Sequence, residues 1–139
     1  MSASAPSPTL PDPAATPHIA VARQAVLDHE RAIFGYELFD RSVQADQHTS
    51  ATDAQMLFNL LSGSDTEAIA GGKTIFINCT HDSLAGGHLD LVAPERVVLE
   101  IPPLPVTEVD QIQNLLASLQ GVHQRGFRLA FDFSVLTRP

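Results

Sequence analysis

Residues 97–133, VVLEIPPLPVTEVDQIQNLLASLQGVHQRGFRLAFDF, predict a strand, a helix and a second strand in succession. The β-branched run Val97–Ile101 is typical of a buried strand, and the prolines that follow it exclude a helix at that point. Thr107 can cap a helix that Gly126 would end. The run 127–133 then predicts the next strand. The apolar stripe of the helix consists of Ile112, Leu115, Leu116, Leu119 and Val122.

The same alternation extends toward the start of the chain. Residues 74–79, TIFINC, form another short β-branched and aromatic run, and a helix is expected before it, beginning with the capping-box spacing of Thr52 and Gln55. Further upstream, residues 19–27 and 32–39 predict two strands joined by a polar corner. Two strands followed by three helix–strand units indicate an α/β fold with a parallel sheet or barrel.

Composition and charge limit the function classes. The chain has 139 residues, 44% of them apolar, which is typical of one globular domain. Its formal net charge of −8, with only eight Lys and Arg, argues against DNA or RNA binding. Cys79 is the single cysteine and cannot form an internal disulfide. Neither a signal peptide nor an apolar run of membrane-spanning length is present, so we expect no membrane association and a cytoplasmic location.

The first 17 residues differ in composition from the rest. They consist largely of Ser, Ala, Thr and five prolines, and such a segment buries too little apolar surface to offset the entropy lost on ordering. We expect residues 1–17 to be a disordered tail and residues 18–139 to form the folded domain.

Four polar residues interrupt or end four successive apolar strands. Because ligand sites in parallel α/β folds lie at the carboxyl ends of strands, we expect these side chains to converge. Their oxygen atoms suit a hard divalent cation such as Mg2+ or Mn2+. The alternative is that each strand-end acid is solvated or caps the following helix. The candidate metal ligands are Glu37, Asn78, Glu100 and Asp132.

The sequence around these residues resembles a known family. Segments 22–28 (ARQAVLD) and 34–41 (FGYELFDR) are similar to the opening of EAL domains, especially the branch with a C-terminal HDOD domain. The similarity continues through residues 76–80 (FINCT), 94–101 (PERVVLEI) and 126–132 (GFRLAFD), in order and at the family's spacing. It covers the chain from about Ile19 to the end.

The resemblance implies a (β/α)8 TIM-type barrel that binds cyclic di-GMP and two divalent metals at its mouth and cleaves one phosphodiester bond with a metal-activated water. Glu37, Asn78, Glu100 and Asp132 match the family's metal ligands. Gln24 and Arg41 match positions that contact the dinucleotide. The planar fork of an arginine suits phosphate oxygens or a guanine edge.

Several departures from the family pattern bear on catalysis. Asp132 is followed by Phe133 where the family has a second aspartate, and the chain ends at Pro139, after the fifth expected strand. The family's later lysine, glutamates and glutamine have no counterpart. We therefore expect a truncated EAL-like domain: a partial barrel of about five strands with intervening helices, which binds metal weakly and has no catalytic residue of its own.

Three interpretations follow. The first is a degenerate, inactive signalling module that binds cyclic di-GMP or a protein partner, including a second copy of itself through an open sheet edge. The second is a cyclic di-GMP phosphodiesterase completed by another chain, and the third is a nonfunctional fragment. Other sites are disfavoured, because no two histidines have zinc-ligand spacing and Gly71–Gly72–Lys73 precedes a strand instead of linking strand to helix.

Overall fold

The structure, a computed structural model, describes residues 21–40, 65–103 and 109–132. Several predictions concern residues outside these ranges. They are the tail at 1–17, the dinucleotide contact Arg41, the helix beginning at Thr52 and the cap Thr107.

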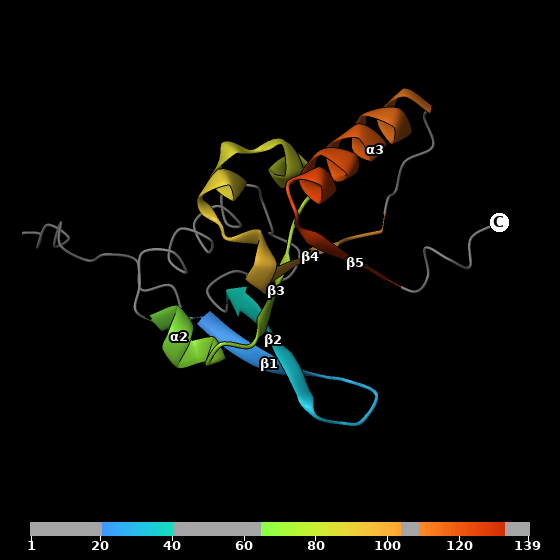
Figure 1. Cartoon of the computed structure of the whole chain (residues 1–139). Coiled ribbons are helices and arrows are strands. Elements are labelled where there is room, and N and C mark those ends of the chain that lie inside the picture. Colours follow the sequence, from blue (N-terminus) through green and yellow to red (C-terminus); the bar gives the residue numbers. More distant parts are fainter. Residues whose placement is uncertain (1–20, 41–64, 104–108, 133–139) are drawn as a thin grey trace, which may run out of the picture.

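Five strands form one sheet in the order β1-β2-β3-β4-β5 (Figure 1). β1 is antiparallel to β2, whereas β2, β3, β4 and β5 are parallel to one another. The sheet is not closed within the described residues, so β1 and β5 are its edges. The prediction of an α/β fold with about five strands is confirmed. The strands are β1 (Val21–Leu27), β2 (Ile33–Asp40), β3 (Thr74–Asn78), β4 (Val97–Ile101) and β5 (Arg128–Phe131).

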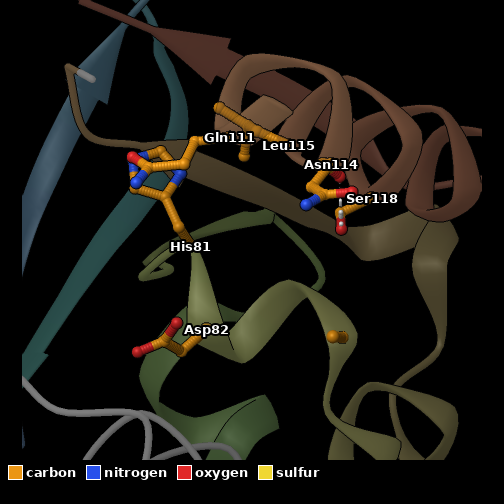
Figure 2. Close-up of a pocket in the computed structure, with 7 residues that line it drawn as sticks. His81, Asp82, Gln111, Asn114, Leu115 and Ser118 are labelled. Atoms are coloured by element: carbon orange, nitrogen blue, oxygen red, sulfur yellow. Dashed lines mark hydrogen bonds between the residues drawn. The ribbon is translucent and has the colours of Figure 1, made fainter. Parts of the chain in front are cut away.

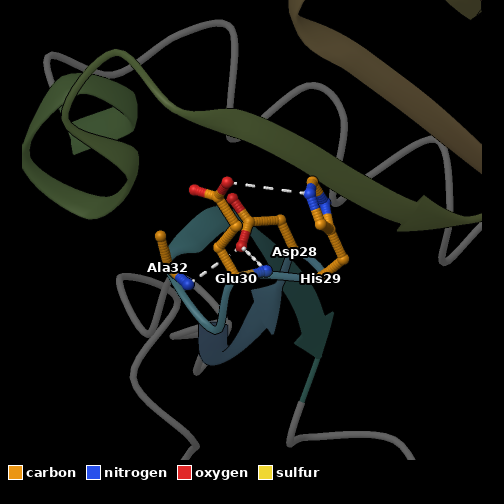
Figure 3. Close-up of polar contacts among 4 residues, drawn as sticks. All are labelled: Asp28, His29, Glu30 and Ala32. Carbon is orange, nitrogen blue, oxygen red and sulfur yellow. Dashed lines mark hydrogen bonds and ion pairs between the residues drawn. The ribbon is translucent and has the colours of Figure 1, made fainter.

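The turn between β1 and β2 is organised by Asp28. Its Oδ1 accepts hydrogen bonds from the backbone N–H groups of Glu30 and Ala32, each at 2.9 Å (Figure 3). Its carbonyl accepts from the N–H of Arg31 at 3.0 Å, and Arg31 adopts a left-handed φ of 65°. Asp28 therefore supplies acceptors for a turn that requires an uncommon backbone conformation. The expected polar corner is confirmed.

The long helix α3 (Val109–Gln124) precedes β5, as the apolar stripe predicts. Gly126 ends it with φ of 96°, a conformation that favours glycine. Leu115 and Val122 are buried on its inner side. A short helix, α2 (Asp65–Ala70), precedes β3.

The connection between β3 and β4 differs from the expectation. A helix–strand unit predicts an α-helix there, but the chain forms three short 3-10 helices, η2 (Asp82–Ala85), η3 (Gly87–Leu91) and η4 (Pro94–Arg96). Gly86 is extended with ψ of 140°, which separates η2 from η3, and Pro94 begins η4. Leu84 and Leu89 are nevertheless buried at 3% and 0% exposure, so this connection covers the sheet as an α-helix would.

The two faces of the sheet have different character, because side chains alternate along each strand. On one face, called here the core face, Leu38, Ile77 and Leu99 lie in register across three strands at 0%, 1% and 0% exposure. Residues of the helices and connections pack against them to form the core. The opposite face, called the open face, contains Glu37, Phe76 and the other residues that alternate with the core residues.

Gly35 permits the close approach of β2 to β3. A Cβ at this position would lie against the carbonyl oxygen of Thr74 and 2.9 Å from Cε2 of Phe76. Thr74 is the register partner of Gly35. Gly35 is therefore required for strand pairing beside Glu37.

Among the described residues, no helix combines the length and the apolar character that crossing a membrane would need.

Candidate functional site

Three of the predicted metal ligands lie together on the open face. β2, β3 and β4 are parallel neighbours, so their carboxyl ends lie at the same end of the sheet. Asn78 and Glu100 are register partners, and Glu37 is the partner of Phe76, two residues before Asn78. Side chains two residues apart along a strand lie on the same face, so Glu37, Asn78 and Glu100 all project from the open face.

Glu37 is the hydrogen-bond acceptor at the centre of this group. The side-chain amide Nδ2 of Asn78 donates to Oε1 of Glu37 at 3.1 Å. Because β2 and β3 are separated in sequence by a long connection, this bond joins residues 41 positions apart. It fixes the orientation of the Asn78 amide, whose carbonyl oxygen is then directed away from Glu37.

Among the titratable groups of the described residues, Glu100 has a strongly shifted pKa. Its pKa is raised to about 7, chiefly by burial and then by repulsion from the Glu37 carboxylate and a hydrogen bond between the two side chains. Oε2 of Glu100 is buried and has no hydrogen-bond partner among the described residues. Two carboxylates that disfavour each other's charge, one with an unsatisfied buried oxygen, form a site that a proton or a cation would stabilise.

Gln24 lies beside this group. It is on β1, directly opposite Glu37 in the antiparallel pair, and its side chain is exposed on the same face. Directly opposed residues share a face in antiparallel sheets. The predicted dinucleotide contact is therefore a neighbour of a predicted metal ligand, while the second predicted contact, Arg41, lies outside the described residues.

Asp132 stands apart from the other three candidates. It directly follows β5 and is exposed. It comes two residues after Ala130, the register partner of Glu100, and therefore lies on the open face. However, no group of three or more His, Cys, Asp or Glu side chains in the described parts of the chain is close enough to hold a metal. Glu37, Glu100 and Asp132 thus share a face without forming a three-carboxylate cluster.

The donor set of Glu37, Asn78 and Glu100 fits a hard divalent cation in its chemistry. All three can present oxygen, and the unpartnered Oε2 of Glu100 is available as a ligand. Three ligands leave several coordination positions for water, which is the usual arrangement for Mg2+. These residues would hold Mg2+ or Mn2+ weakly, and the ion would offset the repulsion between Glu37 and Glu100.

A separate cleft of about 440 Å3 lies between η2 and α3 (Figure 2). His81 and Asp82 border it on one side, and Asn114 and Ser118 of α3 on the other. Both ring nitrogens of His81 are buried without a hydrogen-bond partner among the described residues. None of the residues that line the cleft belongs to the set of Glu37, Asn78 and Glu100, called here the Glu37 group. Sequence reasoning gave these positions no role, because nothing in their spacing distinguishes them from surface residues.

The chain is distantly similar to a known phosphodiesterase. No family model matches the chain, and no solved structure matches it. Over 119 residues, 81% of the chain, it is 33% identical to the cyclic di-GMP phosphodiesterase CdgJ of Vibrio cholerae serotype O1. The chain spans only 26% of the length of that protein. The similarity supports a relationship to cyclic di-GMP signalling.

Proposed function

We propose that this chain is an EAL-type signalling module that binds cyclic di-GMP at the open face of a partial (β/α)8 barrel and does not hydrolyse it. Gln24 and Arg41 contact the dinucleotide, and Glu37, Asn78 and Glu100 are the oxygen ligands for a weakly bound Mg2+ or Mn2+. The observation that supports this proposal is the Asn78–Glu37–Glu100 group at the carboxyl ends of adjacent parallel strands. Similarity to a cyclic di-GMP phosphodiesterase supports the ligand class.

Each residue of this site has a role that its chemistry allows. The exposed amide of Gln24 can donate to a phosphate oxygen or accept from a guanine edge. The negative charge shared by Glu37 and Glu100 attracts a cation, and the cation in turn attracts the phosphates of the dinucleotide, which the acidic residues alone would repel. Asn78 positions Glu37 through its hydrogen bond.

The proposed absence of turnover rests on the residues present. Hydrolysis by two metals needs carboxylates that bridge them, and Asp132 is followed by Phe133 where the resemblance implies a second aspartate. In the described residues the acidic side chains do not gather into a set of three. A single weakly held ion is sufficient to bind a phosphate but not to stabilise both the attacking and the leaving oxygen.

One observation favours a second candidate function. The similar protein is named as a phosphodiesterase, and the chain corresponds to about a quarter of it. In this alternative the remaining catalytic residues come from further polypeptide, and the module becomes part of a phosphodiesterase.

The deciding experiment is calorimetric titration of the full chain with cyclic di-GMP in Mg2+, combined with chromatography for the linear dinucleotide. We expect binding without linear product. Binding should be lost in Glu37→Gln and retained in Glu95→Gln, a matched change at an exposed glutamate of η4. Metal-dependent product that disappears in Glu37→Ala would refute the proposed absence of turnover. No binding by the folded wild-type chain would refute the proposed binding module.

A further inference from the structure

The second edge of the sheet, β5, has an unusual sequence symmetry. Residues 128–132 read RLAFD, with opposite charges at the ends and apolar residues between them. In the described residues no strand pairs with the outer side of β5. It contains no proline, charge or bulge at its centre, which are the features that usually protect an edge from pairing.

An apolar surface continues from this edge onto α3. Val109, Ile112 and Leu116 are 66%, 37% and 52% exposed, and they recur at the three- and four-residue spacing of one helix side. Gln111 of the same helix borders the cleft with η2. At 100° per residue, the three apolar side chains lie about 100–160° around the helix axis from Gln111, so they point away from that cleft.

The position of η2 determines where this stripe points. α3 packs against η2, which follows β3, and β3 lies on the far side of β4 from β5. The side of α3 that faces away from η2 is therefore the side toward the open edge. Phe131 is 50% exposed on β5 and belongs to the core face, the face that α3 covers. The edge and the stripe form one surface, defined here as the β5 surface: Val109, Ile112, Leu116 and residues 128–132.

From this surface we infer that two copies of the chain associate through antiparallel pairing of β5 with β5. A two-fold axis at Ala130 pairs each residue with the one at the mirrored position of the partner copy. Arg128 then lies opposite Asp132 of the other copy, twice per dimer, and Leu129 lies opposite Phe131. Opposite charges and apolar pairs at directly facing positions both stabilise antiparallel strands.

The dimer accounts for the exposed helix stripe as well. Antiparallel pairing of the two edges joins the sheets so that the core faces of both copies lie on the same side. The two α3 helices therefore lie on the same face of the joined sheet. Their stripes, which contain Ile112 and Leu116, then face each other across the axis and are removed from water. In the single copy Arg128 donates from Nη2 to Thr74 Oγ1 and to the carbonyl of Glu95, at 3.2 and 3.3 Å, on the inner side of β5. Its side chain is exposed and exchanges these two bonds for the partner carboxylate when the copies pair.

This association is independent of cyclic di-GMP, because it uses the edge and the helix side and not the Glu37 group. It is tested by sedimentation equilibrium of the full chain without nucleotide, over a concentration series. A reversible dimer is expected. Arg128→Glu and Asp132→Arg each place like charges opposite one another at two positions and should raise the dimer dissociation constant about tenfold.

The charge-swapped double variant Arg128→Glu/Asp132→Arg restores opposite pairs and should recover dimerisation, which a general loss of folding would not allow. Leu116→Glu should weaken the dimer without changing the monomer's circular dichroism. Lys73→Glu, in the exposed turn before β3, is the charge-matched control for Arg128→Glu. A monomer at every concentration, a dimer indifferent to both single charge reversals, or a double variant no better than either single variant would overturn the inference.

Discussion

Asn78 donates its side-chain amide to Glu37 across 3.1 Å, joining the carboxyl ends of two parallel strands. The bond leaves Glu37 with its charge partly offset, whereas Glu100, on the next strand, has a buried oxygen with no partner among the described residues. Changes of pH or of divalent metal concentration should therefore affect this part of the sheet mainly through Glu100.

Glu100 should make stability depend on pH. The pKa of Glu100 is about 7 in the folded chain against an ordinary 4.5, so the folded state binds more protons between these values. The free energy of unfolding should therefore fall as pH rises from 4.5 to 7, by about 1 kcal/mol after solvent screening is allowed for. Glu100→Gln should abolish this slope and be the more stable protein above pH 7. Urea unfolding at a series of pH values measures it, with Glu95→Gln as the control. An unchanged slope in Glu100→Gln would contradict the assignment.

Divalent metal should stabilise the chain modestly. An ion that binds only the folded state raises its melting temperature by mass action, and a weak three-oxygen site corresponds to a rise of about 2–5 °C at millimolar Mg2+ or Mn2+. The rise should be larger at pH 8 than at pH 6, because protons compete for Glu100. Differential scanning fluorimetry checks it. A rise that persists in Glu100→Gln would mean that the ion binds elsewhere.

Gly35→Ala should destabilise the sheet. The added Cβ meets the Thr74 carbonyl oxygen, which belongs to the backbone of the paired strand and cannot move without loss of register. A cost of about 1–3 kcal/mol is expected, as for overpacking elsewhere. Gly121→Ala is the matched control, since a Cβ added there would have no neighbour within 4 Å and α3 should gain about 0.5–1 kcal/mol. Equal effects of the two substitutions in chemical unfolding would contradict the close approach.

Asp28→Ala should weaken the β1–β2 turn. It removes the acceptor of two backbone N–H groups while Arg31 keeps its left-handed conformation. A loss of about 1–2 kcal/mol is expected from thermal unfolding. Glu30→Ala, at a neighbouring carboxylate whose ion pair with His29 is almost fully exposed, should change nothing measurable. If Glu30→Ala costs as much as Asp28→Ala, the turn is not held as described.

The sequence predicted most of the strands because their signals are local. β4 was expected at Val97–Ile101 and lies there, and α3 follows its apolar stripe to the positive φ of Gly126. The prediction for the connection from β3 to β4 was wrong, because the extended Gly86 interrupts the backbone of a segment whose leucines are nevertheless buried. Periodicity reports burial, and here burial does not require an α-helix.

The candidate site was predictable only in part. Strand-end polarity identified Glu37, Asn78 and Glu100, which do share one face and one end of the sheet. It could not show that the pKa of Glu100 rises, since burial and the approach of Glu37 depend on how the strands twist and pack. Strand-end polarity also could not show that Asp132 lies apart from Glu37 and Glu100, because it depends on the order of residues along the chain and gives no distances between side chains.

The Asp28 turn also has a consequence for the order of folding. Of the strand pairings that the structure describes, only β1 with β2 connects neighbouring strands through a tight turn, and the others wait for crossovers. Hairpins form in about 1–10 μs, well before long-range parallel pairing. Gln24 and Glu37 face each other within this hairpin. We therefore expect the first contact of the proposed site to assemble locally, with the sheet added afterwards around residues already in place.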